Sequence, residues 1–188
     1  KSDQTPIWMM RQAGRYLEEY RTVRTKQKNF ISFCLNSTQA ATVTTQPITR
    51  FNFDAAIIFS DILLVPWAMN RNVIFKEGVG PLLDPMCDPG DIDLKCLEEL
   101  DNKLNPVANS IKLTKKLLPK KTALIGFAGA PWTLITYMAE GKSSRDFIKA
   151  RLWAWQDQKK LEQLLEIIVH ATVSFLCLQA KAGADCLM

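Results

Sequence analysis

The sequence predicts an α/β protein whose central strands run parallel to one another. Apolar runs at residues 54–61 and 122–129 are continuous rather than alternating, which is typical of strands that are covered on both faces. Segments between the runs carry apolar residues at spacings of three and four, the period of a helix. A doubly wound sheet and a (β/α)8 barrel both fit this alternation of strands and helices.

A third strand is predicted at residues 183–188, and the sequence stops within it. The predicted strands are about sixty residues apart, so each repeating unit carries insertions. Residues 70–95 are rich in Gly, Pro and Asp and are predicted to form an excursion, with a short extra strand at 72–76. A complete barrel takes about 250 residues. We therefore expect residues 1–188 to form a single partial domain, the N-terminal part of a larger protein.

Four segments are predicted to be helical. Residues 159–181 carry one apolar stripe, and residues 105–118 form a shorter helix with a basic face. Asn105 followed by Pro106 predicts a capped start for this second helix. Residues 37–50 are predicted as a helix despite several threonines, and Pro131 is predicted to open another helix.

Composition excludes several classes of protein. Of the 188 residues, 47% are hydrophobic and 23% are charged, so a disordered or collagen-like chain is excluded. The net charge of +5 is mild and permits an anionic partner without identifying one. Lysines near residues 115–121 lack the interleaved aromatic residues of a nucleic-acid surface, so no nucleic-acid partner is predicted.

The same counts bear on metal sites, redox compartment and membranes. Five dispersed cysteines without a Cys-x-x-Cys pair argue against a disulfide framework and a cysteine zinc site, and a single histidine leaves little for a metal centre. The apolar stretch 55–69 is broken by Asp61 and Pro66 and is shorter than the ~20 residues of a membrane span. We expect a protein of the cytoplasm with no metal site and no membrane partner.

The first candidate site is the segment Arg11-Gln-Ala-Gly-Arg15. If the segment is helical, the two arginines share a face; if it is a turn, Gly14 exposes backbone N–H groups. Either geometry presents forked guanidinium donors that match carboxylates or phosphates. The structural alternative is an arginine pair that bridges to Glu18 and Glu19.

The second and third candidate sites follow the two apolar runs. Asp61 ends the first run, at the strand end where functional groups gather in parallel sheets; the alternative is a helix N-cap. Small residues at 126–130 end the second run and allow close approach of a ligand. Tyr137 follows inside the predicted helix. Either its hydroxyl reaches the same end of the sheet, or its ring packs between the helix and the sheet.

Taken together and in order, these three segments resemble the uroporphyrinogen decarboxylase family. The resemblance rests on Met10 to Leu17, Asp54 to Leu63 and Gly126 to Met138, and it spans nearly the whole chain. It implies a (β/α)8 barrel of roughly twice this length, a homodimer, and cofactor-independent removal of the four acetate carboxyl groups of uroporphyrinogen III to give coproporphyrinogen III.

The resemblance also implies roles for individual residues. Arg11 and Arg15 would hold substrate carboxylates and act in catalysis, with the backbone of Gln12, Ala13 and Gly14 on the same wall. Asp61 would accept the pyrrole N–H groups at the centre of the macrocycle and stabilise a positively charged ring. The further substrate-binding residues are Arg24, Phe127 and Tyr137.

Two alternatives stay open at this point. One is a related corrinoid or methylthiol methyltransferase barrel, whose His and Cys zinc ligands would lie outside residues 1–188. The other is a barrel without enzymatic activity that binds anions through Arg11 and Arg15.

Overall fold

The computed structural model describes residues 5–188, which divide into two compact units. Unit 1 contains the residues up to Asp61, together with Asn105–Phe127 and Leu176–Met188. Unit 2 contains Ile62–Leu104 and Ala128–Phe175. The two long helices α5 (Leu100–Leu117) and α8 (Gln158–Ala182) contribute residues to both units.

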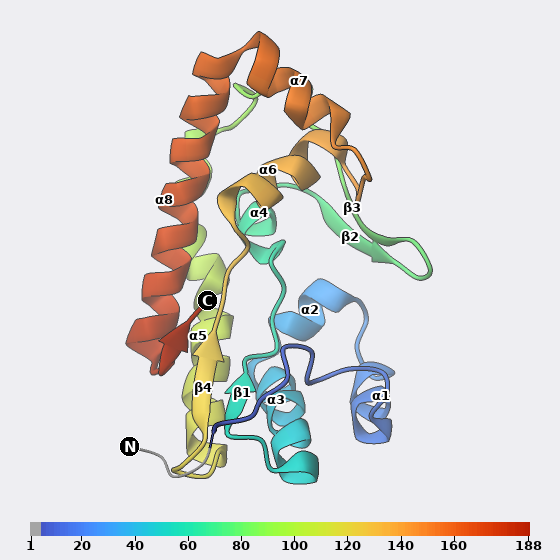
Figure 1. The fold of residues 1–188 in the computed structure, drawn as a ribbon, viewed down its shortest axis with the longest axis vertical. Helices are drawn as coiled ribbons and strands as arrows, with labels where there is room; N and C mark the ends of the chain where they lie inside the picture. The colour runs from blue at the N-terminus through green and yellow to red at the C-terminus, as the bar shows by residue number, and fades with distance from the viewer. Residues whose placement is uncertain (1–4) are drawn as a thin grey trace. The chain divides into compact units, whose positions relative to one another are not determined.

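Unit 1 is built on a parallel three-stranded sheet, in the order β1–β4–β5 (Figure 1). The strands β1 (Ala55–Ile57), β4 (Ala123–Gly126) and β5 (Cys186–Leu187) lie within the three predicted apolar runs. The strands are shorter than the runs, yet the backbone pairing continues past them: Ile58 N donates to Ile125 O at 3.0 Å. The predicted α/β class with parallel strands is therefore confirmed.

Three helices precede β1 in unit 1: α1 (Glu18–Arg24), α2 (Phe30–Cys34) and α3 (Ser37–Phe51). The predicted helix at 37–50 is confirmed as α3, which is capped by the Asn36 side chain and packs beside β1 (Figure 1). Its threonines do not break it, because their hydroxyls donate back to helix carbonyls; Thr44, for example, bonds to Ala40 O at 2.7 Å.

The predicted helix start at Asn105 is wrong. Helix α5 begins at Leu100, and Pro106 lies inside it. A proline in a helix leaves the carbonyl four residues earlier without its N–H partner. That carbonyl belongs to Asn102, an exposed residue. Because solvent can satisfy it there, the helix continues through a proline that the sequence pattern reads as a start signal.

Unit 2 contains α4 (Leu64–Ala68), an antiparallel hairpin, the 3-10 turn Leu94–Leu97, α6 (Pro131–Glu140) and α7 (Ile148–Gln156). The hairpin consists of β2 (Val73–Lys76), which confirms the predicted extra strand, and β3 (Gly80–Leu83), which was not predicted. Glycine and proline open β3, and both are depleted in strands. Pro131 opens α6 as predicted.

Helix α8 confirms the long helix predicted at 159–181 and extends it by one residue at each end. Its apolar stripe is buried at Leu161, Leu164, Ile168 and Phe175. Among the residues that the structure describes, α8 is also the one helix long and apolar enough to cross a membrane, a test that core helices of water-soluble proteins pass as well. The prediction of no membrane span rested on the stretch 55–69 and did not consider this helix.

Candidate active site

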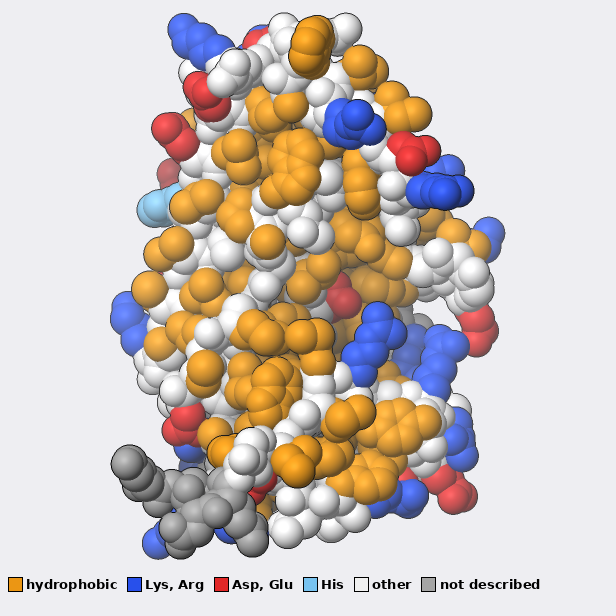
Figure 2. Space-filling model, viewed as in Figure 1, with side chains coloured by type: hydrophobic (Ala, Val, Ile, Leu, Met, Phe, Trp, Pro, Cys, Tyr) orange, Lys and Arg blue, Asp and Glu red, His pale blue; other side chains and the backbone are white. Residues whose placement is uncertain are grey.

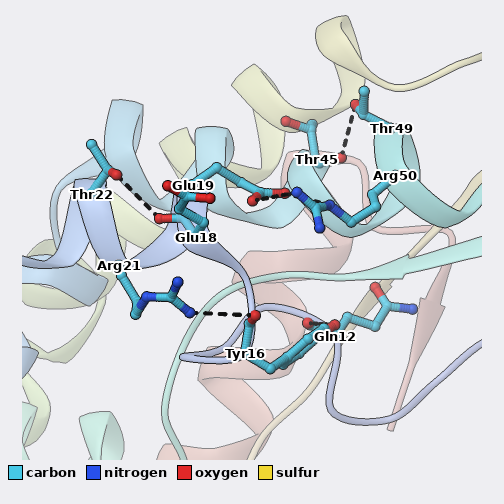
Figure 3. A network of polar contacts seen from close by, with 9 residues as sticks. All are labelled: Gln12, Tyr16, Glu18, Glu19, Arg21, Thr22, Thr45, Thr49 and Arg50. Atoms are coloured by element: carbon cyan, nitrogen blue, oxygen red, sulfur yellow. Dashed lines mark hydrogen bonds and ion pairs between the residues drawn. The ribbon is translucent and has the colours of Figure 1, made fainter.

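Arg11 and Arg15 lie on a loop that ends in a turn, not on a helix. Leu17 N donates to Gly14 O at 3.0 Å, which closes the turn, and helix α1 begins only at Glu18. Both arginines are exposed. The alternative was that the two arginines pair with the glutamates of α1. For Glu19 the partner is different: its carboxylate binds Arg50 of α3 at 3.0 Å (Figure 3).

The Gln12 side chain attaches this loop to β1. Its Nε2 donates to Ala55 O at 2.7 Å, and its Oε1 accepts from Ile57 N at 3.1 Å. Gln12 is 3% exposed, although its neighbour Arg11 is exposed and Ala13 is half-buried. The side chain therefore faces the sheet, and only the backbone of Gln12 is available to line a binding wall.

Two further contacts hold the loop. The Tyr16 hydroxyl donates to Gln12 O, and Arg21 of α1 donates to Tyr16 O at 3.5 Å (Figure 3). Arg21 also donates to Arg15 O at 2.8 Å. The Tyr16 ring stacks on Phe51. Burial, aided by the negative charge of Glu19, raises the pKa of Tyr16, so its hydroxyl stays protonated and remains a donor near neutral pH.

The loop forms one wall of a cavity of about 460 Å3 in unit 1. This volume lies within the range of small-molecule sites. The cavity is lined by Met10, Arg11, Gln12, Ala13, Gly14, Arg15, Tyr16, Tyr20, Phe30, Ile57, Ile58, Phe59, Ser60 and Phe127. The structure thus brings six of the nine predicted site residues to one cavity, with guanidinium groups on one wall and apolar side chains on the others.

An aromatic cluster forms the apolar side of the cavity. The Phe59 ring lies 4.6 Å from Phe33 and 5.8 Å from both Tyr20 and Phe30, measured between ring centroids. The backbone of Phe59 is fixed as well, because its N–H donates to the buried Thr44 hydroxyl at 2.9 Å. Such rings suit a flat, partly apolar ligand.

Arg24 lies beside this aromatic cluster. Its guanidinium carbon is 6.0 Å from the centroid of the Phe33 ring, and Nη1 donates to Gln27 O at 3.2 Å. Its positive charge lowers the pKa of Tyr20, although burial leaves that pKa raised overall. Arg24 is therefore in the same unit as the cavity without being among the residues that line it.

Asp61 follows Ser60, a cavity residue, and is half-buried. It does not cap a helix, because the N-cap of α4 is Leu63 and makes no side-chain cap. Burial raises the pKa of the Cys34 thiol well above its ordinary value, and the negative charge of Asp61 raises it further. The negative charge of Asp61 is therefore felt at Cys34, the neighbour of Phe33 in α2.

The end of β4 is fixed by a second glutamine. Gln179 is fully buried; its Oε1 accepts from Phe127 N at 2.9 Å and its Nε2 donates to Phe127 O at 2.8 Å. A Cβ on the neighbouring Gly126 would lie 2.6 Å from Gln179 Oε1. Glycine at 126 is therefore required by this close approach, and Phe127 is held at the cavity.

Tyr137 belongs to unit 2, where it is half-buried on α6. Within that unit Gly129 sits directly against α6, since a Cβ there would lie 2.5 Å from Leu134 Cδ2. Close packing thus explains Gly129. Tyr137 was predicted beside Asp61 and the arginines, and its role there stays a prediction.

The segment that contains the loop carries a surplus of basic residues. Figure 2 shows Lys and Arg side chains gathered around the region of α1 and α2. Residues 11–28 contain six basic and two acidic residues. Such a local surplus attracts polyanionic ligands. Within residues 5–188, the structure shows no group of three or more His, Cys, Asp or Glu side chains placed to hold a metal ion.

Sequence reasoning missed three features of this site. The side-chain contacts of Gln12 and Gln179 join residues 43 to 52 positions apart, a pairing that no local pattern encodes. The third is Ser60, whose Oγ is buried and has no hydrogen-bond partner among the described residues. Its position directly before Asp61 was the only available signal.

Comparison with protein families gives one match along the whole chain. The family model described as uroporphyrinogen decarboxylase (URO-D) matches residues 1–188. Curated relatives named uroporphyrinogen decarboxylase include those from Maricaulis maris, 47% identical over 182 residues, and Rickettsia felis, 48% identical over 187 residues. These matches cover 97% and 99% of this chain but only 52% and 54% of the relatives. The chain therefore spans about half the length of the curated relatives it matches.

Comparison with solved structures gives a more distant likeness. A methyltransferase from Methanosarcina mazei superposes with a TM-score of 0.68 at 15% sequence identity. The match covers 89% of this chain and 49% of the methyltransferase. At this level of identity the likeness concerns the fold alone.

Proposed function

Because the chain belongs to the uroporphyrinogen decarboxylase family, we propose that the protein removes the carboxyl groups from the four acetate side chains of uroporphyrinogen III, giving coproporphyrinogen III. The observation that carries this proposal is the cavity of unit 1, whose lining combines two exposed arginines, aromatic residues and the segment that leads to Asp61. A tetrapyrrole with eight carboxylates and four pyrrole N–H groups matches these residue types.

Substrate binding is proposed to divide between three kinds of group. Arg11, Arg15 and Arg24 bind carboxylates, since guanidinium forks form charge-assisted pairs with them. Phe127 packs near the reacting ring, and Tyr137 contacts a carboxylate of the bound substrate. The backbone of Gln12, Ala13 and Gly14 completes the wall that carries the arginines.

The chemical step needs an acceptor for the electron pair that the departing carboxylate leaves behind. Protonation of the pyrrole carbon next to the acetate-bearing carbon gives an iminium-like cation. The bond to the carboxylate then breaks, carbon dioxide leaves, and its electron pair neutralises the ring. A proton added to the exocyclic methylene, with loss of the proton from the ring carbon, gives the methyl group. The ring itself supplies the electron sink, so we propose a cofactor-independent reaction.

Asp61 is proposed to stabilise the cation. An ionised carboxylate beside the pyrrole N–H groups interacts more strongly with the positive ring than with the neutral one, which lowers the barrier. The proton donor is proposed to be Arg11 or a water held by it; the high pKa of an arginine favours the water.

The test is Asp61→Asn in the complete protein, assayed anaerobically with uroporphyrinogen. We expect the single-turnover rate to fall by about 10²–10³-fold, because the variant keeps the shape and loses the charge. Asp146→Asn is the matched control, since that carboxylate is exposed and outside the site. Near-normal turnover by Asp61→Asn would contradict the assignment.

Four broader features are part of the proposal. The complete chain is a (β/α)8 barrel, of which residues 1–188 form the N-terminal portion as a single partial domain. The α/β likeness to a longer solved chain supports this. The complete protein is a homodimer of the cytoplasm, and it acts on a small-molecule substrate without nucleic acid or membrane as a partner.

A further inference from the structure

We propose that Gln12 is a positioning residue, whose side-chain amide sets the place of Arg11 and Arg15 relative to the strand segment that ends at Asp61. This inference rests on the proposed function of the cavity. It concerns a residue whose side chain faces away from any ligand, so its role differs from that of the two arginines.

The hydrogen-bond geometry shows what Gln12 replaces. On one edge of β1, the backbone pairs with β4: Ala123 N donates to Asp54 O, and Ile58 N donates to Ile125 O, both at 3.0 Å. On the other edge, Ala55 O and Ile57 N are bound by the Gln12 amide. One side chain thus supplies the donor and the acceptor that a neighbouring strand would supply.

Two of the anchors of the arginine loop meet at this residue. The Gln12 side chain is bonded to β1, its carbonyl accepts the Tyr16 hydroxyl, and Arg11 is its direct neighbour in the chain. Arg15 follows in the turn closed by Gly14 and Leu17. From Ile57, the same backbone runs through Ser60, a cavity residue, to Asp61. The amide therefore links the loop that carries the guanidinium groups to the strand segment that leads to the carboxylate.

A direct role in binding through the side chain is excluded by the same contacts. One Nε2 proton and Oε1 are engaged with buried backbone, and the residue is 3% exposed. The Gln12 side chain can act on the substrate only by holding its neighbours. A displacement of about 1 Å in a positioning group can cost up to 10²-fold in rate.

The first test compares Gln12→Glu with the unchanged complete protein across pH. An ionised glutamate still accepts from Ile57 N but cannot donate to Ala55 O, whereas a protonated one can. We expect kcat/KM at pH 8 to fall about 10- to 100-fold, mainly through a raised KM. The deficit relative to the unchanged protein should shrink toward pH 6 as the carboxyl group gains its proton. A pH-independent deficit, or one confined to kcat, would overturn the proposal.

The second test does not depend on activity. Trypsin cleaves after Arg11 and Arg15, and the anchored loop should resist it. Gln12→Ala should raise cleavage at these two bonds at least 10-fold relative to other sites. Gln179→Ala, which removes an equally buried glutamine from β4, is the matched control for general loosening. Equal cleavage at Arg11 and Arg15 in both variants would overturn the positioning role.

The two tests separate the possible failures. If the unchanged protein does not decarboxylate uroporphyrinogen, the proposed function is wrong, while the trypsin comparison still decides whether Gln12 positions the arginines. If the unchanged protein is active and neither Gln12 variant differs from its control, the positioning role alone is wrong.

Discussion

Gln12 and Gln179 show how single side chains fix the backbone of this protein. Each amide bonds to a strand or to the residue that follows one, so two segments that line the cavity are held by side chains from elsewhere in the chain. The sequence marks the charged residues of the site clearly, because charge at a strand end is a local signal. It does not mark the glutamines, because their partners lie far away along the chain.

Cys34 gives a residue-scale prediction. The thiol is fully buried, and burial and then the negative charge of Asp61 raise its pKa, so it stays protonated at pH 7.5. The thiolate is the reactive form of cysteine. We expect iodoacetamide to modify the exposed Cys87, Cys177 and Cys186 well before Cys34 in the native protein, as followed by peptide mass spectrometry. Modification of Cys34 as fast as Cys87 would contradict this placement.

At the scale of elements, Asp185 strengthens the junction between β4 and β5. Its N–H donates to Leu124 O at 2.8 Å, its Oδ2 accepts from Leu124 N at 2.7 Å, and its carboxylate pairs with Lys115. Burial, the largest single influence, raises the pKa of Asp185. The hydrogen bonds and charge of Lys115, with the bond from Leu124 N, outweigh it and leave the pKa below its ordinary value.

Asp185→Asn should therefore lower the free energy of unfolding above pH 5. The expected loss is about 1 kcal/mol, since the partly exposed ion pair is screened by solvent. A carboxyl group with a lowered folded pKa stabilises the protein above its unfolded pKa of about 3.9 and ceases to do so as pH falls through the folded value. In urea unfolding, the two proteins should differ at pH 7 and converge below about pH 3. A constant difference at both pH values would contradict this role.

Helices and strands were predicted correctly where a single local sequence signal marks them. The three parallel strands, α3, α6, α8 and β2 follow from apolar runs, helical spacing or a leading proline. The helices α1, α2, α4 and α7 were not predicted. The start of α5 and the strand β3 were also missed, because proline and glycine there act against their usual local preference. Tertiary contacts override such local preferences. The candidate site residues could therefore be named from the sequence, whereas the first and last residues of the elements that carry them could not be predicted.

At the scale of the whole molecule, residues 1–188 are about half the length of the relatives they match. A substrate with eight carboxylates needs contacts on more sides than one cavity wall offers. We expect the purified 188-residue chain to show no decarboxylation of uroporphyrinogen under conditions in which the complete protein is active. Measurable loss of carboxyl groups with the shorter chain would show that the described residues suffice.

The sheet of unit 1 has two unlike borders. At residues 55 and 57, β1 already has its outward hydrogen-bonding groups occupied by Gln12, so an additional strand arriving there would have to displace that amide or meet β1 elsewhere along its length. At the opposite border, β5 has a strand on one side only. New backbone can therefore join directly beyond residues 186 and 187, whereas closure of the proposed barrel at β1 requires the last strand to pair beside the Gln12 amide or to displace it.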